Sequence, residues 1–295
     1  MSSGKSLHPV SGRTLTKLSS LLIPFMVLFL GGLTLALVQS LGYWVPIPPE
    51  GGMFAAYGEL VRPHIIDAAI HSIWVALISM VLAVSIGAIL ASLIWLLPST
   101  LERMSIVYKI PLILPHIAVA FIVLIFWSQS GVIASIGNLL GLVETPQDFP
   151  SLIHGGSGAG MILAYVYKEI PFVIILAHAV LKRLDPRLVQ TASMLGAGPM
   201  TIFFKIMLPH MRPALNTASI ILFLYAFGAF DIPYLLSESS PSMLSIEAFN
   251  LYFRRDLSNR PQAMALLICM FLFSLAFIVI YTRLAARLSA KDRKL

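Results

Sequence analysis

Charged residues are scarce in this 295-residue chain. Only 11% of its residues are Asp, Glu, Lys or Arg, whereas soluble domains carry about 25%. With 58% hydrophobic residues and a mean hydropathy of +0.89, the composition excludes an ordinary soluble domain and predicts a membrane protein. Cysteine is also scarce, because Cys269 is the only one. A single cysteine excludes an internal disulfide and a cysteine-based metal cluster.

Six runs of the chain contain no charged residue. They cover residues 18–49, 68–101, 110–143, 149–167, 213–230 and 261–282. A hydrocarbon core of about 30 Å needs about 20 apolar residues in a helix, and barrel strands of ~10 alternating residues do not fit these runs. We therefore predict an all-α, polytopic integral membrane protein. Its six transmembrane helices are expected near residues 19–40, 66–96, 106–128, 159–181, 212–235 and 262–284.

The distribution of Lys and Arg predicts the orientation of these spans. With the N-terminus in the cytoplasm, fifteen Lys and Arg residues fall in cytoplasmic segments, and only Arg62, Arg254, Arg255 and Arg260 fall in outer loops. Because cytoplasmic loops carry an excess of Lys and Arg, we expect a bacterial inner-membrane protein with both termini cytoplasmic. The net charge of +7 reflects this topology and requires no nucleic-acid partner.

The N-terminal part of the chain is expected to contain a cytoplasmic segment, residues 1–18, and a first transmembrane anchor helix, residues 19–40. A cleaved signal peptide is the alternative, since the lead-in is basic. The apolar stretch from Leu18 to Val38 is longer than the usual 7–15-residue core of a signal peptide, which favours an uncleaved anchor.

The predicted outer loops, near residues 41–63, 129–158 and 236–261, carry no enzyme motif. In the second loop, apolar residues recur at helical spacing and predict a short helix at the outer interface. The glycine-rich run at 155–160 lacks the Gly-Lys-Ser/Thr that completes a phosphate loop. The histidines are too dispersed for a metal site, and no acid/base pair has workable spacing. We therefore expect no catalytic residue and no metal in this chain.

The longest inner loop, residues 182–211, has the pattern of two short helices. Asp185 occupies an N-cap position and Pro186 the first helical position. Four residues then share one helical face: Leu188, Thr191, Ala192 and Leu195. Gly196, Gly198 and Pro199 are expected to end this helix before a second one begins. Two explanations are open at this stage: a knob that binds a partner protein, or a helix pair lying on the membrane surface.

This inner loop resembles the cytoplasmic EAA loop of ABC-importer permeases. In that loop Glu-Ala-Ala, three residues and Gly are followed about nine residues later by Ile-x-Leu-Pro. The matching positions are Gln190, Thr191, Ala192, Gly196, Ala197, Ile206, Leu208 and Pro209. The resemblance covers residues ~60 to 290, and the flanks "YVYKEIPFVIILAHAVLKRLDP" and "FGAFDIPYLLSESSPSML" look like the polyamine-type branch. Gln190 departs from the usual Glu, so a charge-assisted pair with an ATPase is lost at that position.

The resemblance implies a type I ABC-importer permease fold, with a five-helix core over residues 60–290 that includes the coupling loop, residues 182–211. It implies a non-catalytic subunit with three protein partners besides lipid. These are a cytosolic ATPase dimer that binds ATP and Mg, a second permease subunit (a paralogue is favoured over a copy), and an outer solute-binding protein. The ATPase-coupling residues it implies are Asp185, Gln190, Thr191, Ala192, Leu195, Gly196, Ala197 and Pro209.

The outer segment around residue 256 also belongs to this resemblance. Arg254, Arg255 and Asp256 are the residues expected to contact the solute-binding protein. Similar-looking permeases carry polyamines, aminoethylphosphonate, thiamine or ferric iron, so the implied function is import of one such small solute.

Lys168 and Glu169 are the unusual residues of the fourth span. They lie ~15 Å from its outer end, near the bilayer midplane, where charges are costly and commonly functional. Two roles are open for them: contact with the substrate or gate, or pairing between helices that fixes packing. Asp231, near the outer end of the fifth span, is a further candidate for the substrate pathway or a simple interfacial residue. An ion-coupled secondary transporter using such residues is the alternative function.

Overall fold

The computed structural model describes residues 12–98, 105–238, 240–253 and 256–292. Helices and loops account for all of these residues, and the predicted all-α class is confirmed. The α-helices are α1 (Gly12–Ser40), α2 (Ala55–Gly58), α3 (Pro63–Leu96), α5 (Ile110–Ile113), α6 (His116–Trp127), α7 (Val132–Leu139), α8 (Ala159–Leu181), α9 (Pro186–Met194), α10 (Pro199–Ile202), α11 (Leu208–Gly228), α12 (Asp231–Leu236), α13 (Leu244–Phe253) and α14 (Arg260–Asp292). The short 3-10 and π elements are η1 (Glu59–Val61), η2 (Ser105–Lys109), η3 (Pro146–Asp148), η4 (Phe203–Met207) and η5 (Leu257–Asn259).

The chain divides into two compact units. The first comprises Met1–Leu60 and Leu251–Phe271, and the second comprises Val61–Asn250 and Leu272–Leu295. Within the first unit, the hydroxyls of Ser40 and Tyr57 lie 2.7 Å apart and join the end of α1 to α2. Arg260 lies over the ring of Tyr252, 5.1 Å from its centroid. The apolar side chains of α1 are largely exposed, as expected of a helix that faces lipid.

Five helical segments are long and apolar enough to cross a membrane. They are Leu22–Ser40, Pro63–Leu96, His116–Leu139, Ala159–Leu181 and Leu257–Leu288. The predicted helix in the second outer loop is found as α7. Helix α11, which covers most of the expected fifth span, is not among the five because Arg212 and Asn216 lower the hydropathy of its first half. The count of six spans therefore stays a prediction.

Two expected spans are interrupted in the structure. The predicted helix over 106–128 breaks at Leu114, because Pro115 has no N–H to continue the ladder and favours an extended residue before it. The predicted helix over 212–235 ends at Gly228, and α12 begins only at Asp231 after the extended residue Ala229. Both continuous-helix expectations were wrong, since each span is two shorter pieces.

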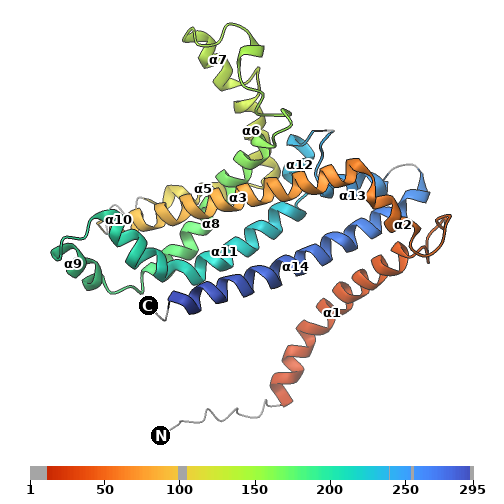
Figure 1. Ribbon diagram of the computed structural model, residues 1–295, viewed down its shortest axis with the longest axis horizontal. Coiled ribbons are helices and arrows are strands. Elements are labelled where there is room, and N and C mark those ends of the chain that lie inside the picture. The colour runs from red at the N-terminus through yellow and green to blue at the C-terminus, as the bar shows by residue number, and fades with distance from the viewer. Residues whose placement is uncertain (1–11, 99–104, 239, 254–255, 293–295) are drawn as a thin grey trace. The chain divides into compact units, whose positions relative to one another are not determined.

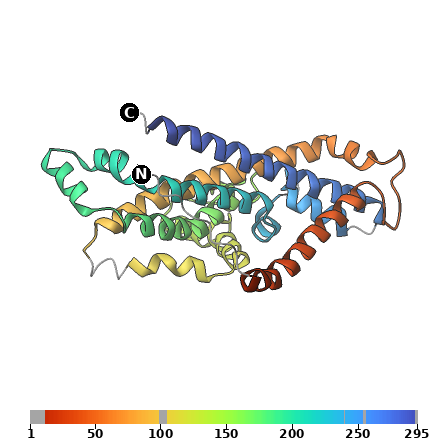
Figure 2. The same ribbon diagram turned by 90° about the horizontal axis from the view of Figure 1, so that it is seen from below.

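The core of the second unit is built from α3, α8 and α11, which pack on one another (Figure 1). Figure 2 shows the same three helices, in orange, green and teal, side by side from a second direction. Fully buried alanines line α3 at Ala68, Ala76, Ala83 and Ala91. At Gly87 an added Cβ would lie 2.6 Å from the Cβ of Val173. Small residues therefore set the spacing of these helices, as is common in membrane helix packing.

Candidate functional site

The coupling loop begins with the helix cap that its sequence predicts. The Asp185 carboxylate accepts a hydrogen bond from the backbone N–H of Arg187, at 2.9 Å, and Pro186 occupies the first turn of α9. The carboxylate thereby satisfies one of the free N–H groups at the helix start. Asp185 is exposed, so its role in the chain itself is to fix where α9 starts.

Helix α9 ends in a Schellman motif at Gly196. The residue has a φ of +84°, in the left-handed region that favours glycine. Its N–H donates to the Ser193 carbonyl at 3.0 Å, and the Ala197 N–H donates to the Ala192 carbonyl at 2.9 Å. A Cβ added at Gly196 would meet no atom within 4 Å. The backbone conformation, rather than crowding inside the chain, therefore accounts for glycine at this position.

The predicted apolar face of α9 is exposed. No residue of the helix is buried. Leu188 is 54% exposed and Leu195, just after the helix, is 83% exposed; Gln190 and Thr191 are also exposed, and Ala192 is half-buried. An amphipathic helix normally buries its apolar face, so this one has an apolar surface available to lipid or to another protein.

The second half of the coupling loop continues without interruption into the core. Residues 199–228 are helical throughout, as α10, η4 and α11. Pro209 lies in the first turn of α11, which begins at Leu208. Because Pro209 cannot donate to a carbonyl one turn earlier, the ladder shifts to π-type spacing, and the Leu208 N–H donates to Phe203. The second half of the coupling loop and α11 therefore form one continuous helical element.

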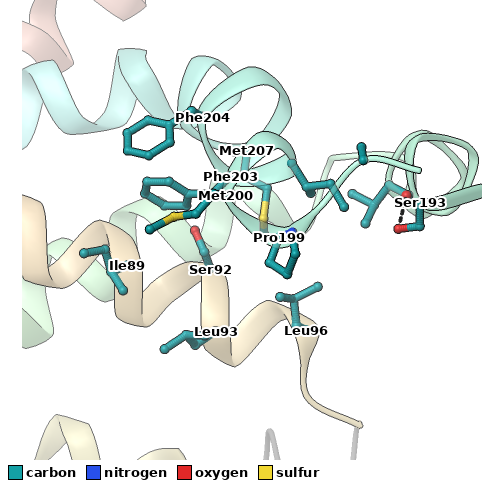
Figure 3. A pocket seen from close by; sticks show the side chains of 13 residues that line it. Ile89, Ser92, Leu93, Leu96, Ser193, Pro199, Met200, Phe203, Phe204 and Met207 are labelled. Atoms are coloured by element: carbon teal, nitrogen blue, oxygen red, sulfur yellow. Dashed lines mark hydrogen bonds between the residues drawn. The ribbon is translucent and has the colours of Figure 1, made fainter. Parts of the chain in front are cut away.

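A cavity of about 430 Å³ lies between the end of α3 and the coupling loop (Figure 3). Its walls are mainly apolar side chains: Ile89, Leu93 and Leu96 from α3, and Met200, Phe203 and Met207 from the coupling loop. Ser92 adds a hydroxyl that already donates to the Ala88 carbonyl at 2.9 Å. Apolar side chains of α3 and of the coupling loop therefore face a common cavity.

Lys168, in the middle of α8, holds the interrupted span in place. Its ammonium group donates to the carbonyls of Pro111 at 2.7 Å, Leu112 at 3.1 Å and Leu114. These carbonyls belong to the last turn before Pro115, where backbone acceptors lack their usual donors. The side chain is 6% exposed. All three of its hydrogens have an acceptor, so Lys168 fixes the packing of two helices.

Glu169 lies next to Lys168 and does not pair with it. The residue is 4% exposed, and neither carboxylate oxygen has a hydrogen-bond partner in the part of the chain that the structure describes. Tyr165 lies one turn before Glu169 on α8, and Tyr225 and Asp231 lie on α11 and α12, which both pack on α8. Adjacent residues on a helix point in different directions, which explains why the two charges are separate.

Tyrosines and a histidine that sequence reasoning left unassigned complete this region. The rings of Tyr165 and Tyr225 lie 6.2 Å apart and nearly perpendicular, and His116 lies 4.7 Å from Tyr225. The Tyr165 hydroxyl donates to the Ala226 carbonyl at 3.4 Å. His116 is the first residue of α6 and Asp231 is the first of α12, so both helix breaks meet α8 here. We call Tyr165, Glu169, Tyr225 and Asp231 the acid–tyrosine cluster.

The predicted contact residues for an outer binding protein are only partly described. Arg254 and Arg255 lie outside the described residues. Asp256 is exposed and caps η5, accepting a hydrogen bond from the Ser258 N–H at 2.9 Å. Hydrogen bonding by Ser258 lowers the pKa of Asp256, so the residue is an anion at neutral pH.

A family model and several known proteins match most of the chain. Residues 83–290 match the family model described as "Binding-protein-dependent transport system inner membrane component". The chain is 27% identical over 228 residues to the molybdenum transport system permease protein ModB of Azotobacter vinelandii, covering 76% of this chain and 95% of ModB. It is 26% identical over 184 residues to the spermidine/putrescine transport system permease protein PotB of Salmonella typhimurium, covering 61% of each.

Solved structures show the same fold. A chain of a bacterial ABC transporter involved in alginate import superimposes with a TM-score of 0.76 at 19% identity, covering 93% of this chain and 96% of that chain. A second structure, of a bacterial alginate transporter in complex with an alginate pentasaccharide-bound periplasmic protein, gives a TM-score of 0.72 at 20% identity. The family model covers more than two thirds of the sequence, and the chain therefore belongs to the inner-membrane permease subunits of binding-protein-dependent ABC importers.

Proposed function

We propose that this permease subunit receives ATP-driven motion through its coupling loop and converts it into import of a small solute. The observation that carries the proposal is the exposed apolar face of α9, next to a helical element, residues 199–228, that runs without a break into the core. A lipid-surface helix would satisfy the same apolar face. It would not explain why residues 199–228 form one helical element that runs from the loop into the bundle.

Cytosolic ATPase subunits are the proposed partners of the coupling loop, and they bind the ATP and Mg. The capped start at Asp185 and the left-handed residue at Gly196 fix the shape of α9. Gln190, Thr191, Ala192, Leu195 and Ala197 then supply a neutral contact surface, and Pro209 sets the π turn. ATP binding acts by changing the relative affinity of the ATPase for two arrangements of the permease.

The remaining partners and the location are proposed from the resemblance to the family. We propose a bacterial inner-membrane location with both termini cytoplasmic, and pairing with a second permease subunit that is a paralogue. An outer solute-binding protein would deliver the solute and contact Asp256, Arg254 and Arg255. The periplasmic protein bound in the related alginate transporter supports an outer partner of this kind.

The solute is proposed to be polyamine-like, or an amine such as aminoethylphosphonate. By their names, relatives transport molybdenum, spermidine and putrescine, or maltose, so family membership leaves the solute open. The flanks of the coupling loop that look like the polyamine-type branch, together with the match to PotB, favour an amine.

The experiment is purification of the tagged full chain from its native membrane. An ABC-type ATPase should co-purify, and its ATP hydrolysis should rise when the loaded outer binding protein is added. Leu195→Glu should weaken ATPase binding roughly 30-fold, because burial of a leucine contributes about 2 kcal/mol and 1.4 kcal/mol is a factor of ten.

Leu139→Glu is the matched control for that variant. Leu139 is 85% exposed in the outer helix α7, against 83% for Leu195, so both changes add a charge at an exposed leucine. The control should keep its ATPase. Equal retention of ATPase by both variants, or no ATPase in the wild-type preparation, would overturn the proposed docking.

A further inference from the structure

The acid–tyrosine cluster lies where two interrupted helices meet the middle of α8. We propose that this cluster is a membrane-level binding site for the ammonium group of a cationic solute. The inference rests on the proposed import of an amine and adds the place within the membrane where the ammonium group binds. It is carried by the charges, burial and ring geometry of four side chains.

Glu169 is the inner end of the site and its strongest feature. The carboxylate is buried, yet neither oxygen has a partner among the described residues. An uncompensated buried carboxylate is costly, and native proteins nearly always satisfy such groups with a donor or an ion. A bound cation that carries N–H donors would supply both the missing charge and the missing hydrogen bonds.

Lys168 does not fill this role. Its three hydrogens already bond to the carbonyls of Pro111, Leu112 and Leu114, on the other side of the break before α6. The lysine is therefore committed to the backbone of the interrupted span. Among the residues that the structure describes, the Glu169 carboxylate has no hydrogen-bond donor.

Two tyrosines lie on the helices that surround the buried acid. Tyr165 precedes Glu169 by one turn of α8 and packs against Tyr225 of α11, while Asp231 begins α12, which also packs on α8. The face of an aromatic ring attracts an ammonium group. The two rings pack edge to face with their centroids 6.2 Å apart, and since Tyr165 is buried, the half-buried Tyr225 is the ring that a cation would reach.

Exposure changes along the cluster in a consistent direction. Asp231 is exposed, Tyr225 is half-buried, and Tyr165 and Glu169 are buried. This order gives an accessible acid at one end and an enclosed acid at the other. A linear diamine would place one ammonium group at each carboxylate, whereas an oxyanion would meet two negative charges.

The test measures ligand binding to the purified complex of this chain with its partner permease and ATPase, in lipid nanodiscs and without the outer binding protein. The probes are 1,4-diaminobutane, molybdate and maltose. Calorimetric titration measures the affinity of the complex for each of them. We expect binding of the diamine only. Glu169→Gln should weaken it at least tenfold, and Asp231→Asn should weaken it by a smaller factor, because Asp231 is partly solvated.

Two controls keep the result interpretable. Glu144→Gln, an exposed outer glutamate, should leave diamine affinity unchanged. Glu169→Gln keeps the side-chain shape and removes an unpaired buried charge, so its ligand-free melting temperature should equal or exceed that of the wild type. Unchanged diamine affinity in Glu169→Gln, preferred binding of molybdate or maltose, or no diamine binding would each overturn the site. ATPase retention in the same preparation tests the proposed function separately.

Discussion

The Lys168 side chain donates hydrogen bonds to backbone carbonyls of another helix, at a break where Pro115 has no N–H to donate. Pro115 interrupts the second span of the core, and the carbonyls of its last turn then accept from Lys168. The neighbouring Glu169 has no such partner. Lys168 and Glu169 are adjacent in the sequence but therefore have different roles: Lys168 bonds to the interrupted span, and Glu169 does not.

Replacing Lys168 with methionine keeps the length of the side chain and removes its donors. Because a buried acceptor without a partner costs about 1–3 kcal/mol, loss of three such bonds should destabilise the complex by several kcal/mol. Thermal unfolding of the purified complex measures this. Lys168→Arg, which keeps donors, should lose less, and Lys205→Met, at an exposed lysine, should unfold like the wild type. An unchanged melting temperature for Lys168→Met would show that the three carbonyls find other donors.

At the scale of elements, the signals that were local in sequence predicted the structure well. Asp185 and Pro186 predicted the start of α9, and Gly196 predicted its end, because caps and left-handed residues act within one turn. The break before Pro115 was missed, since prolines are often tolerated inside membrane helices. The break at Ala229 has no proline of its own and depends on packing between distant segments.

Pro115→Ala should join α5 to α6. The new N–H can donate to the Pro111 carbonyl, and Leu114 is released from its preference for an extended backbone. We expect slower amide hydrogen exchange at residues 114–118 and reduced uptake with continued ATP hydrolysis, because the break borders the acid–tyrosine cluster. Pro111→Ala is the matched control, since Pro111 lies in the first turn of α5, where proline costs nothing. Full uptake by Pro115→Ala would show that the break has no part in transport.

At the scale of the whole molecule, composition predicted the class and family resemblance predicted the partners. The scarcity of charged residues was enough to predict an all-α membrane protein. Among the described residues, five helical segments are long and apolar enough to cross a membrane. The sequence singled out Glu169 and Asp231, but the tyrosines of the cluster were beyond prediction, because only the fold brings Tyr165 of α8 and Tyr225 of α11 together. Membership of the importer family also replaces the ion-coupled secondary transporter considered from sequence.

The predicted topology places residues 139 and 195 on opposite sides of the membrane. Cys269 is the only cysteine, so Cys269→Ser gives a cysteine-free background for single cysteines at these two exposed positions. A membrane-impermeant maleimide should label residue 139 in intact cells and residue 195 only after permeabilisation. Labelling of residue 195 in intact cells would reverse the orientation and remove the basis for ATPase docking.

The space of about 430 Å³ beneath the coupling loop affects how force enters the molecule. A gap of this size offers little resistance, so a push on α9 can first close the gap and only then turn α11. In the proposed assembly the first part of the ATPase movement therefore displaces the coupling loop without yet moving α11. Small thermal movements of the ATPase would be absorbed there, and only a full closure would reach the middle of the bilayer.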